Sequence, residues 1–245
     1  MYDNRPVHGI LVVFGSLVSV ALGSDILVDY TVAEVDGTVV TRSELVAEAR
    51  LTLLRGYGPS VARTAELTPE LLSALLEVVV HRKLLLAELR RLQLEQVPPG
   101  TLEKARDVLR SRFSGPQEQA AFWVAVGLAR PTETYDRTAP PALEAILREE
   151  IAVDLFVDVR IRAGIVLDEQ AVVRCIEANS QIFSGKPLDQ TRARVRARLR
   201  EQHEQEALSR LLGQLKRRAD LRYPTSLKPV AGERKEPMFS CPLRP

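Results

Sequence analysis

The sequence predicts a mostly α-helical protein, a helical bundle with a small β-hairpin near its N-terminus. Hydrophobic residues make up 45% of the 245 residues, which is enough for a buried core. Leu, Ala and Val dominate, whereas aromatic residues make up only 5% and glycines number 13. This composition favours helices packed on helices over a sandwich or barrel, which needs more turn residues. Apolar residues at helical spacing and helix-capping residues support the same class.

The hairpin is predicted over residues 32–40, which read VAEVDGTVV. Two short β-prone runs flank Asp36-Gly37, and Asp-Gly between alternating apolar residues is a tight-turn signal. Directly afterwards, Thr41 and Glu44 form a capping box that begins a helix. Glycines within residues 56–58 mark the end of that helix.

A long and strongly apolar helix is predicted next, from Pro69 to about Gln96, with Thr68 before its first turn. Its apolar residues cover much of its circumference: Leu71, Leu72, Leu75, Val78, Val79, Leu85, Leu86, Leu89 and Leu92. A helix of this kind belongs at the centre of a bundle.

Prolines and glycines divide the remaining chain into further elements. We expect helices over residues 101–113, 117–129, 142–163, 168–182 and 187–218, a loop over 130–141 and a short strand over 219–223. The fifth helix, residues 142–163, places Ile146, Ile151, Leu155 and Val159 on its buried side. The last helix keeps Val195, Leu199, Leu208, Leu211, Leu212 and Leu215 at helical spacing. Residues 224–245 carry five prolines and several charges, and we expect a disordered tail.

The first 24 residues are predicted to form an export signal. Residues 9–24 carry no charge, and this run is short for a membrane span but has the length of a signal-peptide apolar region. Small residues around Gly23 suggest cleavage after that residue, although Asp3 offsets Arg5 and leaves little positive charge at the start. A buried helix or strand and a retained membrane anchor are the alternatives.

Sequence motifs for catalysis or metal binding are not found. The three histidines, His8, His81 and His203, show no ligand or catalytic spacing, and no nucleotide-binding or nucleophile motif is present. We therefore predict no catalytic residues, no cofactor and no metal. Cys175 lies in an apolar helix and is interpreted as a buried inert thiol, although a single bridge to Cys241 is possible in an oxidising compartment. The acidic pair Glu149-Glu150 is interpreted as part of a solvated helix face.

Two groups of side chains are candidates for binding. Arg192, Arg196 and Arg200 share one face of a helix and form a candidate basic surface, with a solvated face as the alternative. Aromatic residues are candidates for an apolar peptide-binding groove, with core packing as the alternative for the adjacent pair: Phe113, Phe122, Trp123 and Phe156. The net charge of only +2 gives the whole chain no strong preference for a charged partner.

The order of these segments resembles a known family. VAEVDGTVVTRSEL followed by LLEVVVHRKLLLAELRRL is similar to the N-terminal domain of SurA-type periplasmic chaperones and of related foldases that contain parvulin domains. The similarity continues through residues 142–183 and ends with GKPLDQTRARVRARLREQHEQEALSRLLGQLKRRADLRY. It covers residues 32–223 and rests on diffuse patterns in collinear order.

The resemblance implies a chaperone domain over residues 25–223, in which the C-terminal helix packs on the N-terminal helices and the closing strand pairs with the hairpin. It implies a non-enzymatic protein of the periplasm that binds unfolded or outer-membrane polypeptides, with neither nucleic acid nor a small molecule as partner. An uncleaved N-terminus would add weak membrane association. The parvulin domain, which family members carry before the last helix, has no room between Phe183 and Pro187.

Other functions stay open. These are an assembly factor related to prolyl isomerases, a structural subunit that binds one folded partner, and a cytoplasmic nucleic-acid binder that uses the arginine face.

Overall fold

The computed structural model describes residues 29–129, 140–224, 227–229 and 241, and its fold is mostly helical with a small antiparallel sheet, as predicted. The predicted export segment and most of the predicted loop over residues 130–141 lie outside this part of the chain. The elements in chain order are β1 (Thr31–Val35), β2 (Thr38–Thr41), α1 (Arg42–Tyr57), α2 (Pro59–Thr64), α3 (Pro69–Arg91), α4 (Thr101–Arg110), α5 (Pro116–Ala125), α6 (Pro141–Arg160), η1 (Arg162–Gly164), α7 (Glu169–Ala178), α8 (Ser180–Phe183), α9 (Leu188–Arg218) and β3 (Leu221–Arg222).

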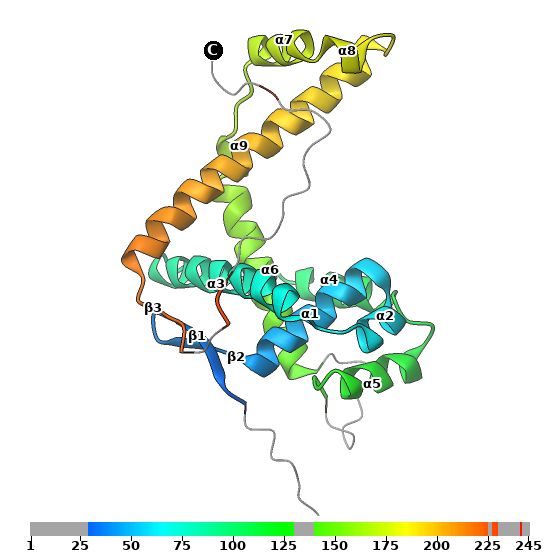
Figure 1. Cartoon of the computed structure of the whole chain (residues 1–245), viewed down its shortest axis with the longest axis vertical. Coiled ribbons are helices and arrows are strands. Elements are labelled where there is room, and N and C mark those ends of the chain that lie inside the picture. The colour runs from blue at the N-terminus through cyan, green and yellow to red at the C-terminus, as the bar shows by residue number, and fades with distance from the viewer. Residues whose placement is uncertain (1–28, 130–139, 225–226, 230–240, 242–245) are drawn as a thin grey trace, which may run out of the picture.

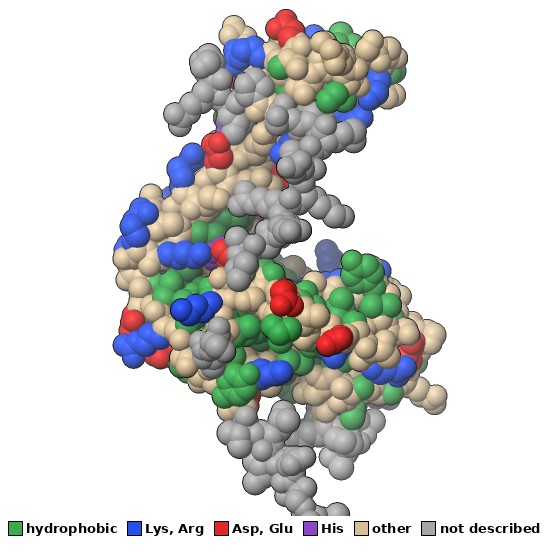
Figure 2. Space-filling view, viewed as in Figure 1, with side chains coloured by type: hydrophobic (Ala, Val, Ile, Leu, Met, Phe, Trp, Pro, Cys, Tyr) green, Lys and Arg blue, Asp and Glu red, His purple; other side chains and the backbone are tan. Residues whose placement is uncertain are grey.

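The molecule has two parts (Figure 1). The body contains the sheet, α1 to α6 and the C-terminal half of α9. The arm (residues 167–203) contains α7, α8 and the N-terminal half of α9, which extends away from the body. In the space-filling view the arm overhangs the body across an open hollow, and Lys and Arg side chains follow α9 (Figure 2).

The predicted hairpin and its pairing with the closing strand are confirmed. Asp36 and Gly37 have φ values of 48° and 77°, the positive pair that a tight turn of this type requires. The sheet has the order β2-β1-β3, and β1 pairs with β3 through Val35 opposite Leu221. The backbone N–H of Asp220 also donates to the Asp36 carboxylate at 2.8 Å, so the two ends of the body are joined at this turn.

Helix α1 begins where the sequence predicts. The Thr41 hydroxyl accepts from the backbone N–H of Glu44 at 3.3 Å, and Gly58 ends the helix with a φ of 85°. The Glu44 carboxylate binds Lys83 of α3 at 2.8 Å, so this residue links two helices as well as standing in the first turn. The short helix α2 was not predicted, although Pro59 at its first turn is a typical helix start.

Helix α3 ends at Arg91, five residues earlier than predicted, because the backbone turns at Gln93. Gln93 has a φ of 57°, and its N–H donates to the Arg90 carbonyl at 3.0 Å. The N–H of Leu94 reaches back to the Leu89 carbonyl at 3.0 Å, which completes a Schellman motif. The sequence gives little sign of the turn, since glutamine replaces the usual glycine.

Replacing Gln93 with glycine is expected to stabilise the protein by up to about 1 kcal/mol, because glycine adopts the left-handed conformation without steric penalty. The midpoint of urea unfolding measures the change. Gln96→Gly is the matched control, since Gln96 is exposed in the same connection without a positive φ. Equal shifts for both variants would contradict this account of the helix end.

Three hydrophobic cores organise the residues that the structure describes. The first joins the sheet, α1, α3, α6 and the C-terminal half of α9, and the second joins α1, α2, α4, α5 and α6. The third lies in the arm and is small: its buried residues are Val172, Cys175, Phe183, Val195, Leu199 and Cys241. The central position of α3 and the packing of α9 against it are therefore as predicted.

The helix predicted over residues 168–182 is instead two helices, α7 and α8, that meet at Asn179. Asp168 caps the first of them as expected, with its carboxylate accepting from the N–H of Gln170 at 3.0 Å. Asn179 leaves the helical conformation, and its side-chain amide donates to the Cys175 carbonyl at 2.9 Å. This local hydrogen bond competes with continuation of the helix.

The described C-terminal residues contact both the body and the arm. Leu227 packs against the first core, and the Ser73 hydroxyl donates to the Lys228 carbonyl. Cys241 is buried in the third core and forms a disulfide with Cys175. The other residues of the predicted tail, 225–226, 230–240 and 242–245, lie outside the described chain.

Candidate functional site

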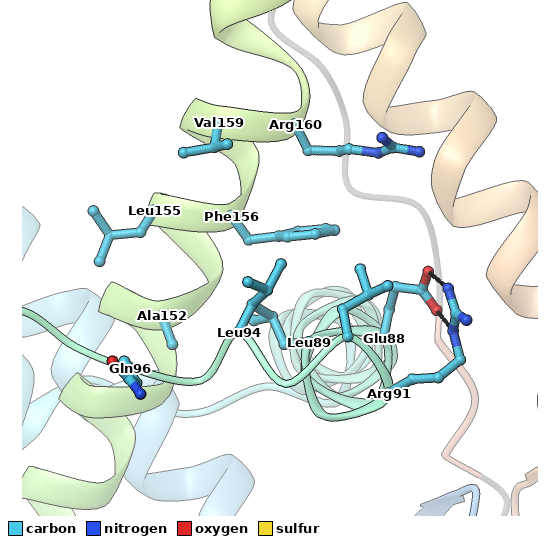
Figure 3. A pocket seen from close by; sticks show the side chains of 11 residues that line it. Glu88, Leu89, Arg91, Leu94, Gln96, Ala152, Leu155, Phe156, Val159 and Arg160 are labelled. Atoms are coloured by element: carbon cyan, nitrogen blue, oxygen red, sulfur yellow. Dashed lines mark hydrogen bonds and ion pairs between the residues drawn. The ribbon is translucent and has the colours of Figure 1, made fainter.

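An open pocket of about 500 Å³ lies where the end of α3 faces the last turns of α6. Its apolar walls are Leu89, Leu92, Leu94, Ala152, Leu155, Phe156 and Val159, and its polar edge is Glu88, Arg91, Gln96 and Arg160. In Figure 3 the side chains of α6 face the leucines at the end of α3. Mostly apolar walls with a few polar groups at the edge are typical of ligand sites.

Three apolar side chains at this pocket are exposed. Val159 is 77% exposed, Leu94 is 55% exposed and Leu92 is 37% exposed. The prediction that Val159 lies on the buried side of its helix is therefore wrong, because Val159 stands in the last turn of α6 at the open pocket. Clustered exposed apolar residues of this kind mark interaction sites.

Positive charge gathers at the polar edge. The Arg91 guanidinium donates to both oxygens of Glu88, at 2.7 and 2.8 Å. This bond lowers the pKa of Glu88, and the charges of Arg218 and Arg160 lower the same pKa further. Three guanidinium groups therefore act on one carboxylate, and Arg160 and the Glu88–Arg91 pair lie on the same side of the pocket (Figure 3).

Only one of the four predicted aromatic residues lines this pocket. Phe156 lies on its wall, although the ring is mostly covered by protein. Phe122 and Trp123 are 2% and 1% exposed in the second core, where their ring centroids are 5.1 Å apart and half-buried Phe113 contacts both. These three rings stabilise the packing of α4 and α5, so no partner reaches the buried pair in this conformation.

The predicted basic surface lies on the arm and is partly neutralised. Arg196 forms a two-point ion pair with Glu169, with both N–O distances at 2.9 Å. Arg192 is half-buried and its charge also acts on Glu169, whereas Arg200 is exposed near the middle of α9. The structure therefore places the three arginines on one helix, as predicted, but does not bring them to the pocket.

A buried ion network ties α1, α3 and α6 together. Arg82 binds Glu48, and both side chains are more than nine-tenths buried. Lys83 binds Glu149 at 2.9 Å, and Arg55 binds Glu150 at 2.6 Å. The interpretation of Glu149-Glu150 as a solvated face is therefore wrong, because both carboxylates face cations of neighbouring helices.

The burial of Cys175 is as predicted, but it is not a free thiol, because it is bonded to Cys241. In the part of the chain that the structure describes, no group of His, Cys, Asp or Glu side chains is arranged to hold a metal ion. Among the same residues, none of the helices is both long enough and apolar enough to cross a membrane. Sequence reasoning missed the pocket, since its exposed valine follows the same helical spacing as core residues.

Comparison of this chain with protein-family models, with curated proteins and with solved structures finds no significant match.

Proposed function

We propose that the protein is a chaperone-like binding protein that holds unfolded polypeptides, including outer-membrane proteins, without catalysing a reaction. The observation that carries this proposal is the open apolar pocket between α3 and α6, with Val159 and Leu94 exposed at its walls. Unfolded chains expose apolar side chains that aggregate when they are left unprotected. A pocket of this kind covers such side chains reversibly.

The dimensions of the site fit weak, transient binding. A volume of about 500 Å³ takes a few side chains of an extended segment and not a folded domain. Because few contacts are available, a bound segment is released without an energy source.

The proposed location is the periplasm. The disulfide between Cys175 and Cys241 supports it, because such bonds persist in oxidising compartments and are rare in the cytosol. The uncharged run over residues 9–24 supports it independently, since it has the length of a signal-peptide apolar region. The resemblance to SurA-type chaperones points to the same compartment.

A holding function without isomerase activity is proposed because of the junction before the last helix. Helix α8 ends at Phe183 and α9 begins at Leu188, so only Ser184 to Pro187 connect them. The foldases that this chain resembles carry their parvulin domain at this junction. A proline-isomerisation assay is expected to show no rate above background.

The proposal is tested by aggregation of an unfolded outer-membrane barrel protein in the presence of residues 25–245. The wild-type chain is expected to suppress light scattering at near-stoichiometric ratios. Val159→Asp is expected to lose most of this effect, because it places a carboxylate on the exposed apolar wall of the pocket.

Val108→Asp is the matched control, since Val108 is 61% exposed on α4 and does not line the pocket. Both substitutions replace an exposed valine, so neither is expected to change the free energy of unfolding by more than about 0.5 kcal/mol. No suppression by the wild-type chain over a range of salt and temperature would end the proposal. Equal suppression of aggregation by the two variants would show that the binding site lies elsewhere on the protein.

A further inference from the structure

The polar edge of the pocket carries more positive charge than its own carboxylate neutralises. Glu88 is bonded to Arg91, and this pair is formally neutral. Arg160 also lines the pocket, and Arg218 stands at the end of α9 within electrostatic reach of Glu88. Both arginines are exposed. The edge therefore has one arginine without a carboxylate partner in the described chain, Arg160, beside an apolar wall, and Arg218 adds a second positive charge that acts on Glu88.

Neither excess guanidinium has a carboxylate of its own among the described residues. The other arginines near this edge show the contrast: Arg91 holds Glu88, and Arg90 holds Glu95 at 2.9 Å. Arg160 and Arg218 form no ion pair or hydrogen bond within that part of the chain. They are thus available to an anionic group that arrives with a ligand, and they gain most from one whose apolar part occupies the pocket.

We propose that the segments this pocket prefers carry an aspartate or glutamate next to their apolar residues, with the carboxylate placed between Arg160 and Arg218. This inference rests on the proposed function and names the chemistry of the client segment. The apolar side chains contact Leu94, Phe156 and Val159. The carboxylate fixes the position of the segment, since a purely apolar pocket distinguishes one apolar side chain from another only weakly.

The carboxylate that binds here belongs to a side chain within the client and not to the client's free carboxyl terminus. An unfolded chain has one terminus but many sites at which an acidic residue follows apolar ones. A chaperone that holds chains along their length therefore meets the internal carboxylate far more often. The terminal carboxylate has the same charge, and the experiment separates the two sources.

The test uses fluorescent peptides with an acetylated N-terminus and an amidated C-terminus, each with two leucines and a phenylalanine. One peptide carries an internal Asp, a second has Asn at that place, and a third has Lys. Fluorescence anisotropy with residues 25–245 is expected to show the Asp peptide binding about three- to tenfold more tightly than the Asn peptide. The Lys peptide is expected to bind most weakly. Salt is expected to reduce both the advantage of the Asp peptide and the disadvantage of the Lys peptide relative to the Asn peptide, because it screens attraction and repulsion alike.

The double variant Arg160→Gln, Arg218→Gln is expected to remove this preference while the Asn peptide binds as before. Arg200→Gln is the control, since Arg200 is an exposed arginine of α9 away from the pocket. Equal binding of Asp and Asn peptides, or a preference that survives the double variant, overturns the inference and leaves the proposed function standing.

Two further outcomes also decide the matter. An Asn peptide with a free C-terminal carboxylate is compared in the same way with the blocked Asp peptide. If the two bind equally tightly, a terminal carboxylate is sufficient, and the proposal of an internal side chain is contradicted. Failure of every peptide to bind, together with failure to suppress aggregation, removes the proposed function and this inference with it.

Discussion

Replacing Arg82 with methionine is expected to destabilise the protein by about 3–5 kcal/mol, because it leaves the buried Glu48 carboxylate without its partner. Both side chains lie between α1 and α3, and Arg82 also lies 3.5 Å from each of Glu149 and Glu150 on α6. Loss of the guanidinium therefore removes a cation that three carboxylates share, and Glu48 loses its ion pair while Glu149 keeps Lys83 and Glu150 keeps Arg55. Denaturant unfolding measures the change.

The double variant Glu48→Gln, Arg82→Met is the control. Removing both charges of a buried pair is often close to neutral, because the desolvation penalty is removed together with the attraction. The double variant is therefore expected to recover much of the stability lost by Arg82→Met. If both variants are equally unstable, the loss comes from packing and not from an uncompensated charge.

The pH dependence gives a second test of the same pair. Burial raises the pKa of Glu48 above its ordinary 4.5, while Arg82 opposes that rise. The Glu48 carboxyl group therefore holds its proton more tightly in the folded state than in the unfolded chain. The stability contributed by Glu48 falls as pH rises through its folded pKa. In Arg82→Met the folded pKa rises further. The destabilisation of this variant is expected to become smaller as pH falls from about 8 to about 5, because Glu48 becomes protonated and loses its charge. A loss of stability that stays constant over that range would contradict the assignment of the effect to Glu48.

Removal of the disulfide, by Cys175→Ser and Cys241→Ser together, is expected to cost about 4 kcal/mol, the loop-closure value for a separation of 66 residues. The effect is expected to be largest in the arm, because its small core consists of six buried residues and the two cysteines are among them. Unfolding monitored by hydrogen exchange measures where stability is lost.

Exchange is expected to speed up in α7, α8 and the N-terminal half of α9, while α1 and α3 keep their protection. The reduced wild-type protein is the matched comparison, since it loses the same bond without a substitution. Uniform acceleration over all helices would show that arm and body unfold as one unit. Unchanged exchange in the arm would show that the bond does not stabilise it.

Much of the body was predictable because local signals and tertiary packing agree there. Asp36-Gly37 has the residues that a tight hairpin turn needs, and Thr41 caps α1 as a threonine before a helix usually does. The length of α9 followed from helical spacing between Pro187 and Arg218. In these elements the local sequence favours the backbone conformation that the structure has.

The pocket was not predictable, because it arises where local preference and structure differ. Gln93 adopts a left-handed conformation that glycine favours, so the end of α3 carries no clear sequence signal. Val159 has the spacing of a core residue, but in the last turn of α6 it faces the open pocket and is exposed. The buried ion network was missed for a related reason. Glu149 and Glu150 are ordinary surface residues until helices with cations pack against them.

The central claim is that unfolded chains bind at the pocket between α3 and α6, and site-specific photo-crosslinking tests it most directly. A photoreactive amino acid is placed at position 159, at the pocket wall, and in a separate protein at position 108, where an exposed valine lies outside the pocket. An unfolded outer-membrane protein is expected to crosslink at position 159, with little product at position 108 and none with the folded client. Equal crosslinking at both positions, or crosslinking only at position 108, would contradict the claim.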